Sequence, residues 1–160
     1  MTTDHRIVPI ASELAPVNIK NSHYPEPFAS LMTDRQKRKL GDMFGLSKFG
    51  VNLTVLAPGG SSALCHRHSK QDEFIYVLEG NPSLVIGDAE YEMAPGQCCG
   101  FPAGVGDAHR LINRTDAPVH FLEVGDRTAG DDVTYPNDDI AAVLDQNGRW
   151  EFRRKDGTLY

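Results

Sequence analysis

The chain has 160 residues, a formal net charge of −6 and three cysteines. Its length suits one domain with a core of ordinary size, and its acidic balance argues against a nucleic-acid-binding surface, which needs cations to neutralise phosphates. No apolar stretch is long enough to span a membrane, and no basic leader precedes an apolar segment. An odd cysteine count is a poor basis for disulfides. We therefore expect one cytoplasmic domain that binds neither nucleic acid nor membrane.

The N-terminal segment, residues 1–30, carries Pro9, Pro16, Pro25 and Pro27 and shows no clear hydrophobic periodicity. Proline lacks a backbone N–H and interrupts helices and strands, so this composition predicts an extended arm. Such an arm can wrap a neighbouring subunit, and we expect a homodimer.

A short basic cluster, Arg-Gln-Lys-Arg-Lys, follows at residues 35–39. Charge runs usually lie in solvent, so we interpret the cluster as a solvated strand or loop, with contact to an anionic partner as the alternative. No helix-turn-helix segment accompanies it, which argues against a complete DNA-binding regulator.

Short apolar runs separated by glycine- and proline-rich turns fill the middle of the chain and predict strands. The expected strands begin near Leu40 and continue at residues 51–57, 65–70, 73–78, 83–86, 90–93, 98–101, 109–113 and 119–124. So many short strands and turns indicate an all-β barrel.

The C-terminal extension, residues 128–160, is expected to be helical or irregular. A short helix is predicted from about Asp138 to Leu144, because Asn137 or Asp138 can cap its first turn and Gly148 follows its end. No internal repeat and no low-complexity tract is present.

Candidate metal ligands lie at the junction of two expected strands. Side chains two apart in a strand share a face, so His66 and His68 point the same way, and Glu73 can fold back beside them from the start of the next strand. Imidazoles and carboxylates are ligands of divalent metals. His109 shares a face with Asn113 in a later strand, and the sequence alone does not show that this face meets the other ligands.

Other reactive side chains have structural explanations. Cys98 and Cys99 are adjacent, so they point to opposite faces of a strand and do not chelate one ion together, and Cys65 faces away from the ligand beside it. His5 and His23 lie in the arm and are interpreted as incidental.

Three polar residues are candidates for a catalytic role in a pocket, namely Tyr76, Asn113 and His120. A lone histidine is more often a surface or core residue than a functional one, so a pocket position for His120 is the alternative interpretation. Glu123 lies on the opposite face of the same expected strand. The sequence identifies no general base.

Two motifs give the chain a resemblance to the cupin superfamily. The first joins a glycine, His-x-His, a glutamate and a second glycine, and is matched by Gly60, His66, His68, Glu73 and Gly80. The second is matched by Gly96, Pro102, Gly104, His109 and Asn113, with four residues between Gly104 and His109 where the commonest form has two. The chain is similar to small bacterial single-domain cupins, and cupins that resemble it include sugar-phosphate isomerases.

The resemblance implies a double-stranded β-helix, or jelly-roll barrel, in which two packed antiparallel sheets hold a metal inside one mouth. Residues 1–160 would form one domain, with the arm at 1–30, the barrel core at about 40–127 and the extension at 128–160. It also implies that His109 joins His66, His68 and Glu73 as a ligand of the metal.

Three imidazoles and one carboxylate leave about two positions of an octahedron open and suit Fe, Mn, Ni or Zn. One such divalent metal can polarise a carbonyl or hydroxyl of a small-molecule substrate, as in an isomerase or epimerase, or hold a chelating substrate together with oxygen, as in a dioxygenase. A non-catalytic cupin that binds or senses a small molecule is the third hypothesis.

The residues expected to face the barrel interior include no lysine or arginine, because strand alternation turns Arg67 and Arg110 outwards. A phosphate group requires cationic partners. A phosphorylated substrate therefore ranks no higher than a neutral or carboxylate-bearing one.

Overall fold

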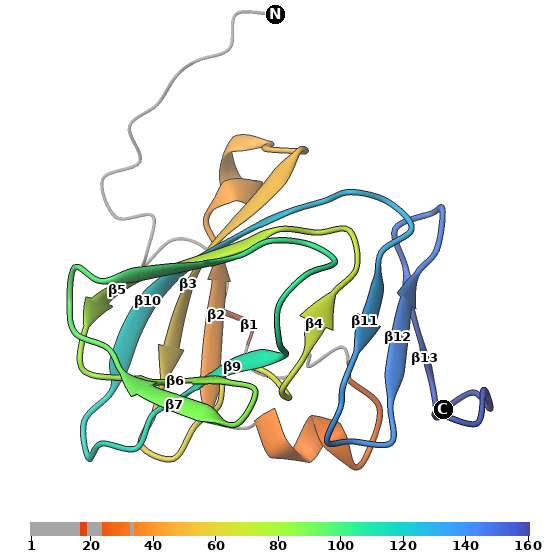
Figure 1. Ribbon diagram of the computed structural model, residues 1–160. Helices are drawn as coiled ribbons and strands as arrows, with labels where there is room; N and C mark the ends of the chain where they lie inside the picture. Colours follow the sequence, from red (N-terminus) through yellow and green to blue (C-terminus); the bar gives the residue numbers. More distant parts are fainter. Residues whose placement is uncertain (1–16, 19–23, 33) are drawn as a thin grey trace, which may run out of the picture.

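The structure, a computed structural model, describes residues 17–18, 24–32 and 34–160, and it is a jelly-roll barrel of facing antiparallel sheets (Figure 1). Most of the predicted arm at residues 1–30 lies outside the described residues. None of the helices in the described part of the chain is both long and apolar enough to cross a membrane.

The first layer is a six-stranded sheet in the order β1-β2-β3-β10-β5-β8. Its strands are β1 (Val17–Asn18), β2 (Arg35–Lys39), β3 (Phe49–Leu56), β10 (Val119–Asp126), β5 (Glu73–Glu79) and β8 (Cys98–Phe101). The two long strands β3 and β10 lie at its centre and pair over their whole length. The sheet therefore gives the barrel one broad and continuous wall.

The facing layer has two parts. One is β7-β6-β9, made of β7 (Ala89–Glu92), β6 (Ser83–Ile86) and β9 (His109–Ile112). The other is β13-β12-β11-β4, made of β13 (Trp150–Arg153), β12 (Ala141–Leu144), β11 (Asp132–Thr134) and β4 (Arg67–His68). An isolated antiparallel bridge between His66 and His109 connects the two parts.

Two short 3-10 helices interrupt the strands, η1 (Phe28–Met32) and η2 (Gly41–Phe44). The prediction that the barrel strands begin near Leu40 was wrong in position, because β2 already starts at Arg35 and η2 follows it. β2 pairs with β3 over five residues, so the basic cluster is a strand of the sheet.

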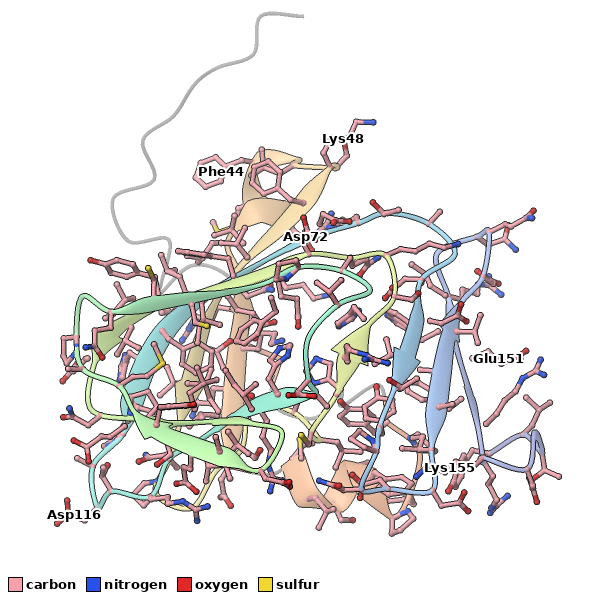
Figure 2. The ribbon with its side chains drawn as sticks, in the orientation of Figure 1. Phe44, Lys48, Asp72, Asp116, Glu151 and Lys155 are labelled. Atoms are coloured by element: carbon pink, nitrogen blue, oxygen red, sulfur yellow. The ribbon has the colours of Figure 1, made fainter. Side chains whose placement is uncertain are left out.

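Alternating burial along the strands builds the core between the layers, and side chains fill the space there (Figure 2). On β10, Val119 and Phe121 are fully buried while His120 and Leu122 are half-buried. A second cluster joins Ile140 and Tyr135 to Phe28 of η1 and to neighbouring apolar residues. The segment around η1 is thereby packed against the C-terminal strands.

The short helix expected from Asp138 to Leu144 is not formed. Residues 141–144 are strand β12, which pairs with β11 on one side and β13 on the other. Ala142 is 1% exposed and Val143 is 37% exposed, which is the two-residue alternation of a strand with one buried face. Pairing on both edges outweighs the helix preference of Ala141, Ala142 and Leu144, and Gly148 lies in the turn towards β13 at a φ of 74°.

Candidate metal centre

Four side chains from separate strand ends converge at one place in the barrel. His68 belongs to β4, Glu73 is the first residue of β5 and His109 is the first residue of β9, while His66 is joined to His109 by the bridge between the two parts of the facing layer. Backbone hydrogen bonds run both ways across this bridge, at 3.1 and 2.8 Å. The pairing of the strand ends therefore brings His109 next to the His-x-His segment.

The carboxylate of Glu73 is the common neighbour of the three imidazoles. Its Oε2 atom lies 3.3 Å from Nε2 of His66, 3.6 Å from Nε2 of His68 and 3.0 Å from Nε2 of His109. The ligand atoms of His66, His68 and Glu73 all lie within 4.8 Å of one another. His109, on β9 of the facing layer, lies next to the same oxygen.

The outer nitrogens of two imidazoles are held by acceptors. Nδ1 of His66 donates to the backbone oxygen of Leu64 at 2.9 Å, and Nδ1 of His68 donates to Oδ2 of Asp131 at 2.5 Å. When Nδ1 carries the hydrogen, Nε2 of the neutral ring presents its lone pair. Both rings are thereby held in the tautomer that a metal requires, and the pair of Asp131 and His68 is the carboxylate–histidine part of a carboxylate–histidine–metal triad.

This arrangement fits a divalent cation. The Nε2 lone pairs of His66 and His68 face a carboxylate that only accepts hydrogen bonds, so a proton or a metal ion is required between them. Although burial opposes it, the charge of Glu73 raises the pKa of His66. Burial opposes ionisation of Glu73 as well, but the charge of His66 and the hydrogen bond from His109 hold the Glu73 pKa well below its usual range.

His109 has a different environment. Its ring stacks on Phe101 with centroids 3.5 Å apart and an interplanar angle of 2°. Burial lowers the pKa of His109, which favours the neutral ring. The neutral ring is the charge state in which histidine ligates metals, and Nε2 of His109, which donates to Glu73, is the ring nitrogen directed at the centre.

Asp131 belongs to the candidate site through its contact with His68, and no motif in the sequence indicated it. Its side chain is fully buried, and besides His68 it accepts from the backbone N–H of Lys70 at 2.7 Å and from Oγ of Ser69 at 3.2 Å. Burial opposes its charge, but the hydrogen bonds, led by that from His68, lower the pKa of Asp131. Asp131 lies 63 residues from His68 in the chain, so no local pattern could indicate the contact.

The ligands open into a cavity of about 330 Å³ between the layers. Tyr135, Trp150 and Phe152 of the C-terminal segment line it, and so does Tyr24, whose ring contacts those of Tyr135 and Phe152. The extension at residues 128–160 therefore contributes directly to the site. A smaller cavity of about 160 Å³ lies beside the centre and shares His68, Glu73 and His109 with the larger one.

The expectation of an interior without cations was wrong. Arg35, Lys37 and Lys39 of β2 line the larger cavity, and so does Arg127. Residues 35–39 were predicted to be a solvated strand or loop, yet basic side chains at every second position are the signal that could have identified these three residues. Arg67 and Arg110 stay out of the larger cavity, but Arg67 lines the smaller one beside the metal centre.

The structure places the three candidate catalytic residues away from the larger cavity. Tyr76 is 38% exposed on the outer face of β5. The Asn113 amide donates to the backbone oxygens of Leu56 and Ala117, and its oxygen accepts from Thr115, so it closes a turn. His120 is half-buried outside the cavity, whereas Glu123, which alternation places on the other face, lines it.

The three cysteines differ in burial. Cys65 is buried, Cys98 is exposed and Cys99 is half-buried, and all three are free thiols.

The loop before β5 is connected to the second motif by a hydrogen bond. Asp72, labelled in Figure 2, accepts from the backbone N–H of Ala103 at 2.7 Å.

Comparison with known proteins identifies relatives over most of the chain. Residues 52–125 match the family model described as Cupin domain. A crystal structure from Silicibacter pomeroyi, described as a sugar phosphate isomerase from a cupin superfamily, is 43% identical, with a TM-score of 0.87 over 93% of this chain and 94% of that chain.

Two further relatives are more distant. A structure from Acidithiobacillus ferrooxidans, provisionally described as a sugar phosphate isomerase, is 32% identical, with a TM-score of 0.71 over 79% of this chain and 80% of that one. A curated protein of Methanocaldococcus jannaschii, described as uncharacterized, is 26% identical over 68 residues, or 42% of this chain. The match spans about half of that protein's length, 53%.

Proposed function

This chain belongs to the cupin family, and from that premise we propose that it is a divalent-metal-dependent isomerase of a small polyhydroxylated metabolite, a sugar or a sugar phosphate. The two solved relatives described as sugar phosphate isomerases support the reaction class. His66, His68, Glu73 and His109 would hold the metal.

One observation carries the proposal. Three Nε2 atoms surround one carboxylate oxygen, two of the imidazoles are held in the metal-binding tautomer, and the group opens into a cavity of about 330 Å³. A closed structural site would have no such space beside it, whereas a catalytic site keeps room for a ligand. When bound, the metal would supply Lewis-acid polarisation of a carbonyl or hydroxyl oxygen.

Glu123 is the side chain that we propose for proton transfer. It lines the cavity from β10, and its Oε1 accepts from Nζ of Lys37 at 2.5 Å, which fixes its orientation. In the strand register Gly125 lies opposite Glu73, so Glu123 is one strand across and two residues along from Glu73. That separates the two backbones by roughly 8 Å, which leaves room for substrate between the side chains.

The proposed reaction moves hydrogen within one molecule. Glu123 accepts the proton from the carbon next to the carbonyl and returns it to the former carbonyl carbon, while the hydroxyl proton passes from one oxygen to the other. No electrons leave the substrate, so no oxidant or reductant is required. The carboxylate ends the cycle in the protonation state in which it began.

Exchange with heavy water tests this function. Metal-loaded protein is incubated in D₂O with a panel of aldoses, ketoses and their phosphates, and NMR follows interconversion and deuterium at the carbon beside the carbonyl. We expect both for at least one pair, and Glu123→Gln should reduce the rate by about 100-fold or more. Glu92→Gln, an exposed position on β7, is the control.

Two outcomes would contradict the proposal. Metal-dependent consumption of oxygen without interconversion would favour the dioxygenase hypothesis. Metal-dependent ligand binding with neither isomerisation nor oxygen uptake would favour a binding or sensing cupin.

A further inference from the structure

The cavity-facing side of β2 carries a row of cations. Arg35, Lys37 and Lys39 are spaced two apart, so they share one face of the strand, and all three line the larger cavity. Arg38, on the other face of the same strand, does not line it. The row is therefore built into the barrel wall by strand alternation, in a chain that is acidic overall.

The charges of this row are only partly balanced. Lys37 forms an ion pair with Glu123 at 2.5 Å. The Arg35 guanidinium donates to a neutral group, the backbone oxygen of Ser62. Among the described residues no carboxylate lies within ion-pair distance of Arg35 or Lys39, so two positive charges face the cavity without a matching anion.

The other charged groups that line the cavity have partners. Arg127 is paired with Asp42 and also donates to the backbone oxygen of Leu46. Asp126 accepts from the backbone N–H groups of Asp72 and Thr128. Glu73 is surrounded by the imidazoles of the metal centre. The uncompensated charge is thus concentrated on β2.

The row lies at a definite separation from the metal centre. The sheet order places β3 and β10 between β2 and β5, which is three strand spacings, or roughly 14 Å, across the sheet, and the register places the row two to six residues along the strands from Glu73. The side chains of the two ends cover part of that span. A small molecule of several bonds in length fits between them.

Two glycines lie in the cavity wall beside Glu73 and leave space there. Gly50 on β3 and Gly125 on β10 are paired with each other, and Gly125 is paired in turn with Glu73. A Cβ at Gly125 would contact Cγ of Glu73 at 3.8 Å, and one at Gly50 would lie 3.7 Å from Arg127. With hydrogen at both positions, the wall beside Glu73 carries no side chain, while Asn52 and Glu123 line the cavity two residues further along the same strands.

Resting on the proposed function for its reacting end, we propose that Arg35, Lys37 and Lys39 form the subsite for the phosphate of a phosphorylated sugar whose carbonyl end lies at the metal centre. A phosphate monoester carries about −1.5 to −2 charges at neutral pH, which matches the two uncompensated cations, whereas a carboxylate balances one. A guanidinium held by one N–H keeps further donors for phosphate oxygens. The C–H faces of the sugar pack on the aromatic side chains that line the cavity.

Ligand binding to metal-free protein tests the subsite separately from turnover. Isothermal titration calorimetry compares glycerol 3-phosphate and inorganic phosphate with glycerol and acetate. Wild-type protein should bind both phosphates and should bind acetate at least about tenfold more weakly. Arg35→Gln and Lys39→Gln should each weaken phosphate binding about tenfold or more, the range expected for a lost charge-assisted contact.

Arg38→Gln is the matched control, since it removes the same charge from the same strand on the opposite face, and it should leave phosphate affinity within about twofold. Lys39 is exposed, so Lys39→Gln keeps the test valid if Arg35→Gln destabilises the fold. Equal losses in Arg38→Gln and Lys39→Gln, unchanged affinity in both Arg35→Gln and Lys39→Gln, or acetate binding as tight as phosphate would each overturn the subsite.

The two proposals fail in different ways. Loss of phosphate affinity in Arg35→Gln and Lys39→Gln, together with no isomerisation of any sugar, would remove the isomerase and retain the subsite. Isomerisation of unphosphorylated sugars, with phosphate binding insensitive to both substitutions, would remove the subsite and retain the isomerase.

Discussion

Replacement of Asp131 by asparagine removes the acceptor that holds His68 in its metal-binding tautomer. The buried carboxylate accepts from Nδ1 of His68, from the Lys70 backbone and from Ser69. Lys70 and Ser69 both donate to Oδ1, so an amide keeps more of its hydrogen bonds with its one oxygen at that position, which directs its NH₂ group at His68. His68 then loses both its orientation and the negative charge that makes its ring a stronger ligand.

The expected effect is a 10- to 100-fold loss of metal affinity, which is the range for such outer partners and corresponds to about 1.4–2.7 kcal/mol. Competition with a chromophoric chelator near neutral pH measures it on metal-stripped protein, with circular dichroism to confirm the fold. Asp132→Asn is the matched control, because it removes a neighbouring exposed carboxylate whose side chain has no described contact with the ligands. An affinity of Asp131→Asn within about twofold of wild type would refute the reasoning.

Three further outcomes are expected. Elemental analysis should find close to one divalent metal per chain, and a combined His66→Ala and His68→Ala variant should contain almost none; unchanged content would disprove the ligand assignment. Gly80→Ala should be about 1–3 kcal/mol less stable in urea than Gly59→Ala, because both glycines have a φ near +80° but only the Cβ at Gly80 would meet Val119, at 2.6 Å; equal losses would show that backbone strain alone matters. The folded-state pKa of Asp131 is depressed below its unfolded value of about 3.9, so its contribution to the free energy of unfolding should be complete above about pH 5 and should decline as pH falls through the folded pKa. Urea unfolding of metal-free protein should therefore show the stabilities of wild type and Asp131→Asn converging towards acid pH. A constant difference in stability would count against this linkage.

Local spacing explains what the sequence predicted well. Strands β6 and β8 were expected at residues 83–86 and 98–101 and have those bounds, because tight turns separate short apolar runs. His66, His68 and Glu73 are close in the chain, so strand alternation and one short loop were enough to bring their side chains together. The expected position of His109 required the resemblance, since only the barrel connects the two motifs.

Tertiary context explains what the sequence did not predict. The basic cluster has the composition of a solvated segment, and only its pairing with β3 turns alternate residues of β2 into the cavity. The segment at 141–144 has residues that form helices readily, yet β11 and β13 supply two strands for it to pair with. Trp150 and Phe152 reach the cavity through the same late strands, so the aromatic lining was not foreseeable from the motifs.

The bridge between His66 and His109 has a mechanical consequence. It lies on a seam, with β9 belonging to one part of the facing layer and β4 with the C-terminal strands belonging to the other. With ligands from both sides of the seam and Glu73 from the opposite wall, an ion at this position would cross-link three separate parts of the barrel. The free energy of metal binding would add to the free energy of unfolding of the barrel. The attachment of the C-terminal strands beside the site would therefore depend on the metal affinity.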